Sequence, residues 1–121
     1  MTWIVLKKNR EMSDRHEADL ASWLPFSRMT PGSGNGFANP TDVRQSRFHT
    51  EYAFAVDGKS TLSKSISVTR DMLDKLVEQS HGERPAMALR YYDNERLTSS
   101  EDWMLIRMDD FIELLEIALG D

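Results

Sequence analysis

Three segments of the chain space their apolar residues three or four positions apart, as amphipathic helices do. They predict helices over residues 14–24, 70–80 and 110–119. Each is preceded by polar side chains of the kind that begin helices: Ser13 or Asp14, Thr69, and Asp109 or Asp110. The side chains expected to face the core are Leu20, Ala21 and Leu24, then Met72, Leu73, Leu76 and Val77, then Phe111, Leu114, Leu115 and Ala118.

Other segments alternate between apolar and polar residues, or form short apolar runs, as strands do. They predict strands over residues 41–45, 52–59, 65–68, 86–92 and 102–107, with the first two forming an antiparallel pair. Residues 1–12 are expected to form an N-terminal arm or an extra strand, centred on residues 2–8. The order of helices and strands predicts one domain over residues 1–121, an α/β fold with a mixed central β-sheet flanked by helices.

The composition narrows the class of protein. The chain has 121 residues and no cysteine, so it fits a single core without disulfides or thiolate metal sites. No apolar run is long enough to span a membrane. The short apolar run at residues 3–6 precedes Lys7 and Lys8, whereas a signal peptide carries its positive charges first. We therefore expect a cytoplasmic protein with no membrane partner.

The net charge of −5 argues at first against a nucleic-acid partner, but the charge is unevenly distributed. Residues 1–75 contain 11 Lys and Arg against 9 Asp and Glu, and residues 76–121 contain 4 against 11. Bound metal would also neutralise acid in the first part. A basic face on an acidic protein is therefore compatible with the sequence.

A glycine-rich loop occupies residues 31–36, with the sequence Pro-Gly-Ser-Gly-Asn-Gly. Three glycines permit backbone conformations in which exposed N–H groups approach a ligand and bind phosphate. The loop lacks the lysine of a P-loop, and no helical pattern follows it directly. An ordinary turn is the alternative interpretation.

Two carboxylates and a lysine follow the loop. Asp42 lies on the first predicted strand of the pair, and Asp57 and Lys59 lie on the second, where alternation places both on one face. Carboxylate oxygens suit Mg²⁺ or Mn²⁺, and a lysine beside them can position water or stabilise phosphate charge. The alternative is a hairpin end, because Asp-Gly at residues 57–58 is also a turn signal.

Two residues of the first predicted helix have polar side chains with competing interpretations. Glu17 shares the face of Leu20 and Leu24, but its spacing from Asp14 also fits a capping box. Helix physics alone favours the cap. His16 is expected to be a solvated helix residue.

In order and spacing these residues resemble the PD-(D/E)XK nuclease superfamily, and within it the archaeal-type Holliday junction resolvases and their phage-encoded relatives. The resemblance covers residues 13–118. It rests on a helical glutamate, a Ser/Gly loop, an aspartate on the next strand, an acidic-x-Lys triplet, a Ser/Thr-rich connection with Lys64, and a final Asp-Phe helix at residues 110–111.

The resemblance implies a restriction-endonuclease-like core and a homodimeric, Mg²⁺- or Mn²⁺-dependent endonuclease that cuts four-way or other branched DNA in recombination or repair. A phage-encoded member would act in the host cytoplasm. Asp42 and Asp57 would hold the metal with Glu17 as a further ligand, and Lys59 would act on the attacking water or the phosphorane. Ser33 would contact the scissile region. The implied DNA contacts are Arg28, Gly32, Ser33, Gly34, Arg44, Arg47 and Lys64. For the three arginines and the lysine, the alternative interpretation is a solvated surface charge without a DNA contact.

The sequence departs from the family pattern at the triplet. The usual glutamate is Asp57, one methylene shorter, and Gly58 replaces a β-branched strand residue. Glu51 shares the strand face of Asp57 and ranks below it as a ligand. Another nuclease or nickase with the same core, and a DNA-binding protein on a decayed nuclease fold, remain as alternatives. For a dimer interface, the candidates are residues 3–6 and the segments around Trp103 and Phe111.

Overall fold

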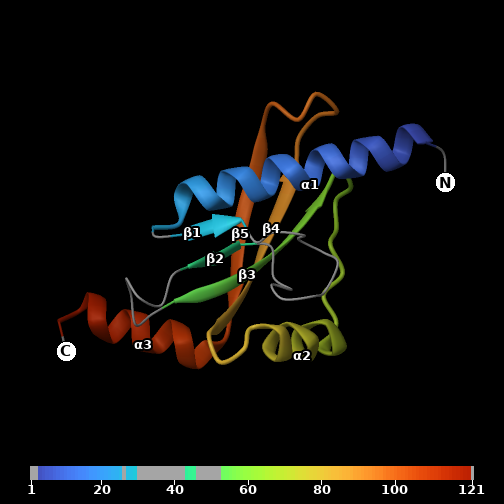
Figure 1. The fold of residues 1–121 in the computed structure, drawn as a ribbon. Helices are drawn as coiled ribbons and strands as arrows, with labels where there is room; N and C mark the ends of the chain where they lie inside the picture. The colour runs from blue at the N-terminus through green and yellow to red at the C-terminus, as the bar shows by residue number, and fades with distance from the viewer. Residues whose placement is uncertain (1–2, 26, 30–42, 46–52, 121) are drawn as a thin grey trace.

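A computed structural model describes residues 3–25, 27–29, 43–45 and 53–120 (Figure 1). It has an α/β architecture, with a mixed sheet flanked by helices, as the sequence predicts. The elements in chain order are α1 (Trp3–Trp23), β1 (Ser27–Met29), β2 (Val43–Gln45), β3 (Phe54–Thr61), α2 (Arg70–Gln79), β4 (Arg84–Tyr92), β5 (Ser100–Ile106) and α3 (Met108–Ala118).

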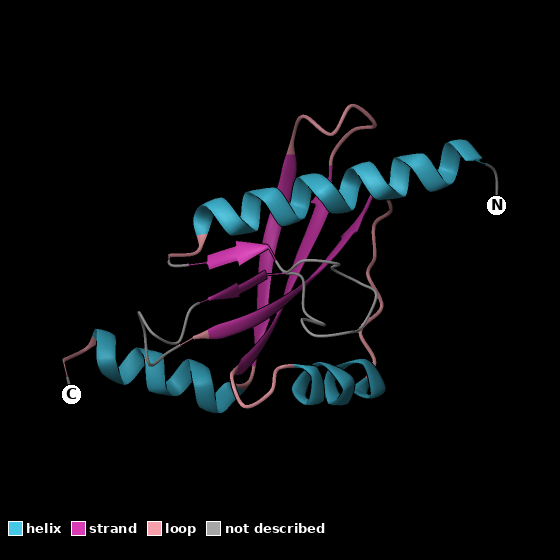
Figure 2. Ribbon diagram, in the orientation of Figure 1, coloured by secondary structure: helices cyan, strands magenta, loops and turns pink. Residues whose placement is uncertain are grey.

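The described strands form one sheet in the order β1-β2-β3-β4-β5. Neighbouring strands are antiparallel except β3 and β4, which are parallel and joined by the crossover through α2. The predicted antiparallel pairing of the second and third strands is confirmed, with Val43 opposite Val56. Helix α1 crosses one face of the sheet, and α2 and α3 lie at the end where β4 begins (Figures 1 and 2).

The main core lies between α1 and the sheet. Leu20 of α1 packs in one cluster with four fully buried residues of the sheet: Val43, Val56, Ala86 and Ala88. These strand residues therefore mark the face of the sheet that α1 covers. Because side chains alternate along a strand, their direct neighbours in sequence point to the opposite face.

Helix α1 starts much earlier than the sequence analysis predicts. Residues 2–8 are expected to be a strand or arm, but the described part of this segment is helical from Trp3. No proline or glycine interrupts the chain before Pro25, so the helix continues through the predicted Ser13 or Asp14 cap and no capping box forms there. His16 falls one turn before Leu20 and is only 2% exposed, so its expected solvation is wrong.

The connection between β3 and α2 corrects a second expectation. Residues 65–68 form no strand. The start of α2 is as predicted, since the Thr69 side chain accepts a hydrogen bond from the Met72 backbone N–H at 3.2 Å. Of the predicted inner face, Leu76 is buried while Val77 is exposed.

Replacing Thr69 by Ala is expected to lower the free energy of unfolding by about 1 kcal/mol, because a backbone donor at the start of α2 loses its partner. Urea denaturation followed by circular dichroism measures the change. Ser67→Ala, in the exposed segment just before the cap, is the control and is expected to change stability little. Equal stability of Thr69→Ala and the parent would contradict the capping role.

Helix α3 packs differently from the prediction. It begins at Met108 after Arg107, whose side chain makes no capping bond, and Asp110 is buried. Arg84 of β4 reaches Asp110 at 3.5 Å and Glu113 at 2.6 Å. This ion-pair network holds a polar side of the helix against the domain. The predicted inner residues Phe111 and Leu115 are therefore 47% and 42% exposed.

Candidate functional site

Asp57 and Lys59 lie side by side on β3. Their carboxylate and ammonium groups are 3.3 Å apart between Oδ2 and Nζ, and both side chains are partly exposed. The spacing of two residues along an extended strand produces this contact, as the sequence predicts. The alternative of a hairpin end at Asp57-Gly58 is wrong, because β3 continues to Thr61 and pairs with β4 throughout.

The face on which this pair lies follows from the strand register. Arg44 stands opposite Ala55 in the β2–β3 ladder, so Ala55 and Asp57 share its face. The Arg44 guanidinium donates hydrogen bonds to the carbonyl oxygens of Gln79 and Ser80, at the end of α2. Asp57 and Lys59 therefore point to the α2 side of the sheet.

Glu17 is half-buried on α1, one turn before Leu20, which packs against the sheet residues Val43 and Val56. Asp57 and Lys59 follow Val56 on β3, where alternation places both on the face opposite to Val56. The expectation that Glu17 faces this pair stays a prediction.

Several predicted site residues lie outside the described residues: Gly32, Ser33, Gly34, Asp42, Arg47 and Glu51. Val43, which follows Asp42 in sequence, pairs with Val56, which precedes Asp57. Within the described ranges, no group of three or more His, Asp or Glu side chains comes together as a metal site.

Three of the basic residues predicted to contact DNA lie in the described part of the chain, at different places in the fold. Lys64 is exposed in the connection after β3, and Arg28 lies on β1 opposite Arg44. Arg44 is largely buried and forms a close ion pair with Glu83 besides its two bonds to carbonyls at the end of α2. Its guanidinium is therefore engaged in holding α2 against β2.

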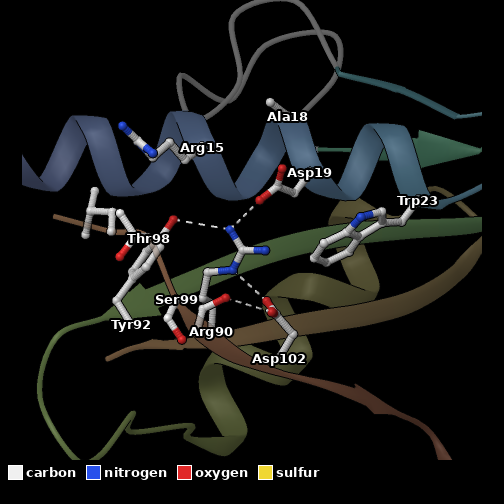
Figure 3. Close-up of a pocket in the computed structure, with 11 residues that line it drawn as sticks. Arg15, Ala18, Asp19, Trp23, Arg90, Tyr92, Thr98, Ser99 and Asp102 are labelled. Atoms are coloured by element: carbon white, nitrogen blue, oxygen red, sulfur yellow. Dashed lines mark hydrogen bonds and ion pairs between the residues drawn. The ribbon is translucent and has the colours of Figure 1, made fainter. Parts of the chain in front are cut away.

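A second polar cluster, around Arg90 of β4, was not anticipated from the sequence. Arg90 is 2% exposed and points to the α1 side of the sheet. Its guanidinium lies between the rings of Trp23 and Tyr92, with Cζ 5.3 Å from the centroid of each ring (Figure 3). Asp19 and Asp102 accept hydrogen bonds from it. Burial by itself lowers the pKa of Arg90, but the bonds to Asp102, Tyr92 and Asp19 outweigh it and raise the pKa. The sequence does contain one sign of this cluster, because Arg90 is a charged residue within the otherwise apolar run at residues 86–92.

Comparisons of this chain with protein-family models, with curated proteins and with solved structures find no match. None of the helices in the described ranges has the length and apolar character needed to cross a membrane. The likeness to the PD-(D/E)XK nucleases thus rests on the residues quoted from the sequence alone.

Proposed function

We propose that this protein is a metal-dependent endodeoxyribonuclease that cleaves branched DNA, with the four-way Holliday junction as its substrate. The observation that carries the proposal is the Asp57–Lys59 pair on β3, with Nζ and Oδ2 3.3 Å apart. An acidic residue and a lysine on one strand face are the pattern that the sequence shares with the PD-(D/E)XK nucleases. The mixed sheet flanked by helices is compatible with such a core.

Asp42 and Asp57 are the proposed ligands of Mg²⁺ or Mn²⁺. Their carboxylate oxygens are the hard ligands that these ions prefer, and Mg²⁺ usually takes only one or two protein carboxylates. The bound ion would supply an activated water and neutralise charge on the phosphate. Glu17 is proposed as a further ligand, direct or through water, as the resemblance implies.

Lys59 is the proposed partner of the reacting phosphate. Its ammonium lies beside the Asp57 carboxylate and keeps appreciable exposure, so it can contact a phosphodiester that approaches this face. A positive charge held there would orient the attacking water and stabilise the extra negative charge of the phosphorane. The single strand β3 thus fixes both groups relative to each other.

The remaining DNA contacts are proposed from the sequence. The loop N–H groups of Gly32 and Gly34, with Ser33, would bind backbone phosphate, and Arg28, Arg47 and Lys64 would add positive charge. Arg44 is left out of this set, because its guanidinium already holds Glu83 and the end of α2.

We further propose that the protein acts as a homodimer. A four-way junction has twofold symmetry, and its resolution needs two paired cuts, which suits a C2 dimer. Exposed apolar residues of β5 and α3 are the proposed interface, with Trp103 and Phe111 59% and 47% exposed. The acidic surface of residues 76–121 would then lie away from the DNA.

Light scattering is expected to give the mass of two chains at micromolar concentration, with and without junction DNA. Trp103→Glu combined with Phe111→Glu is expected to yield a folded monomer, because both side chains are exposed in the single chain and charge opposes their burial. The matched control changes Val77, also exposed but on α2, to Glu. A parent protein that is monomeric under both conditions would reject the dimer and favour a simple nicking nuclease.

A substrate panel tests the proposed activity. The parent protein is incubated with Mg²⁺ and a four-way junction, a linear duplex of the same sequence, or supercoiled plasmid. Paired cuts in the junction, with little cutting of the linear duplex, are the expected result. Equal cutting of all three would indicate a nuclease without junction preference. Junction binding without any cutting, in Mg²⁺ or Mn²⁺, would indicate a DNA-binding protein on a decayed nuclease fold.

A further inference from the structure

The Arg90 cluster contains one donor group and one acceptor atom that form no hydrogen bond within the described residues. Arg90 Nε donates to Asp102 at 2.6 Å, and Nη1 donates to Asp19 at 2.7 Å and to the Tyr92 hydroxyl at 3.3 Å. Nη2 makes no hydrogen bond within the described part of the chain, nor does Oδ1 of Asp19. In Figure 3 the guanidinium nitrogen without a dashed line is directed toward Trp23.

These groups border a pocket between α1 and the start of β5 (Figure 3). Its volume is about 310 Å³, at the small end of the range for small-molecule sites. Besides Arg90, its walls include Trp23, which is 55% exposed although aromatic, and the side chains of Arg15, Asp19 and Ser99. The pocket thus combines a flat apolar surface with a few polar groups, as ligand sites do.

The charges of the pocket favour a neutral ligand. Asp19 and Asp102 accept bonds from Arg90 and balance its charge, so an anion would meet two carboxylates. A cation would meet the guanidinium groups of Arg90 and Arg15. A neutral molecule with its own donor and acceptor avoids both penalties and pairs with the unused groups.

The shape of the pocket favours a planar ligand. The indole of Trp23 is a flat ring and is 55% exposed, and the planar Arg90 guanidinium lies over it, with Cζ 5.3 Å from the ring centroid. A heteroaromatic ring that stacks on Trp23 would bring its edge to Arg90 Nη2 as donor and to Asp19 Oδ1 as acceptor. Every nucleobase carries an acceptor and a donor next to each other on one edge. We propose that this pocket binds a nucleobase, stacked on Trp23.

The base site goes beyond the proposed nuclease function and is separate from it. Arg90 points to the α1 side of the sheet, whereas Asp57 and Lys59 point to the α2 side. Binding there therefore requires neither metal nor cleavage. The base could come from an unpaired position of a DNA strand or from a free nucleoside, and both sources present the same chemistry to Trp23 and Arg90.

The test uses 2-aminopurine, a fluorescent base that is quenched when it stacks on indole. The full chain is titrated in EDTA into the free 2-aminopurine deoxyriboside and, separately, into a duplex with one unpaired 2-aminopurine. Saturable quenching in at least one arm is expected, and the arms identify the source of the base. Deoxyadenosine is expected to compete with the probe, and deoxyribose is not.

Two pairs of variants locate the site. Trp23→Ala is expected to weaken binding roughly 5- to 150-fold, the range for loss of one base-stacking contact. Val77→Ala is the control, since Val77 is also an exposed apolar residue but lies on α2. Asp19→Ala is expected to weaken binding about tenfold through loss of the acceptor. Asp14→Ala, exposed on the same helix, is its control.

Three results would overturn the base site: no quenching in either arm, equal binding by Trp23→Ala and Val77→Ala, or competition by deoxyribose as strong as by deoxyadenosine. Circular dichroism of each variant establishes that it is folded. The quenching test is run without metal, so it does not depend on cleavage. If the protein quenches 2-aminopurine but cuts no DNA, the base site is supported and the nuclease proposal is rejected. If the protein cuts DNA but shows no quenching that depends on Trp23, the nuclease proposal is supported and the base site is rejected.

Discussion

Replacing Asp42 by Asn is expected to lower the rate of Mg²⁺-dependent junction cleavage roughly a thousandfold or more. The substitution keeps the size of the side chain but removes the charge of a proposed metal ligand, and such ions supply several kcal/mol of transition-state stabilisation. Junction binding is expected to remain, because contacts between basic groups and phosphates dominate DNA affinity. Single-turnover cleavage measures the rate, and a gel shift in EDTA measures the binding.

Asp14→Asn is the matched control for this experiment, since it makes the same chemical change at an exposed position of α1. It is expected to cut at the parent rate. If Asp42→Asn also cut at that rate, Asp42 would not be a metal ligand. If it lost cleavage and binding together, with its fold intact, Asp42 would act in DNA binding instead.

Replacing Arg44 by Ala is expected to lower the free energy of unfolding by about 3–5 kcal/mol, the typical cost of removing one partner from a buried ion pair. The Arg44 guanidinium contacts Glu83 and donates to the carbonyl oxygens of Gln79 and Ser80. Its loss leaves the Glu83 carboxylate largely buried and detaches the end of α2 from β2. Urea denaturation, monitored by circular dichroism, measures the change.

Arg15→Ala is the control for Arg44. Arg15 also pairs with a glutamate, Glu11, at 3.2 Å, but both side chains are well exposed on α1. Such pairs contribute about 0.3–0.5 kcal/mol, so this variant should be close to the parent in stability. A loss below about 1 kcal/mol for Arg44→Ala would contradict the structural role and return Arg44 to the candidate phosphate contacts.

The local patterns of the sequence predict much of the fold correctly. The strand alternation around Asp57 and Lys59 places both side chains on one face, and their contact on β3 confirms it. The cap at Thr69 is also local, because one side chain bonds a backbone group three residues away. Features decided within a few residues of the chain are those that such patterns can predict.

Features decided by distant parts of the chain were missed. The helical pattern around Leu20 does not reveal which polar side chains become buried against the sheet, so the burial of His16 could not be derived from it. The spacing of apolar residues in α3 predicts an inner face at Phe111, but ion pairs with Arg84, 26 or more residues away in sequence, turn Asp110 inward. The Arg90 cluster likewise joins α1 to β4 and β5.

Cleavage of a four-way junction by the parent and by Asp57→Asn, measured side by side, tests the central claim most directly. Asp57 lies on the described strand β3, and the substitution preserves its shape while removing the charge that faces Lys59. The parent is expected to cut the junction with Mg²⁺ or Mn²⁺ and to show no cleavage in EDTA. The Asn variant is expected to show no cleavage under any of these conditions. Activity that disappears with Asp57 cannot come from a contaminating nuclease. No cleavage by the folded parent with either metal, or equal cleavage by both proteins, would contradict a metal-dependent nuclease site at Asp57.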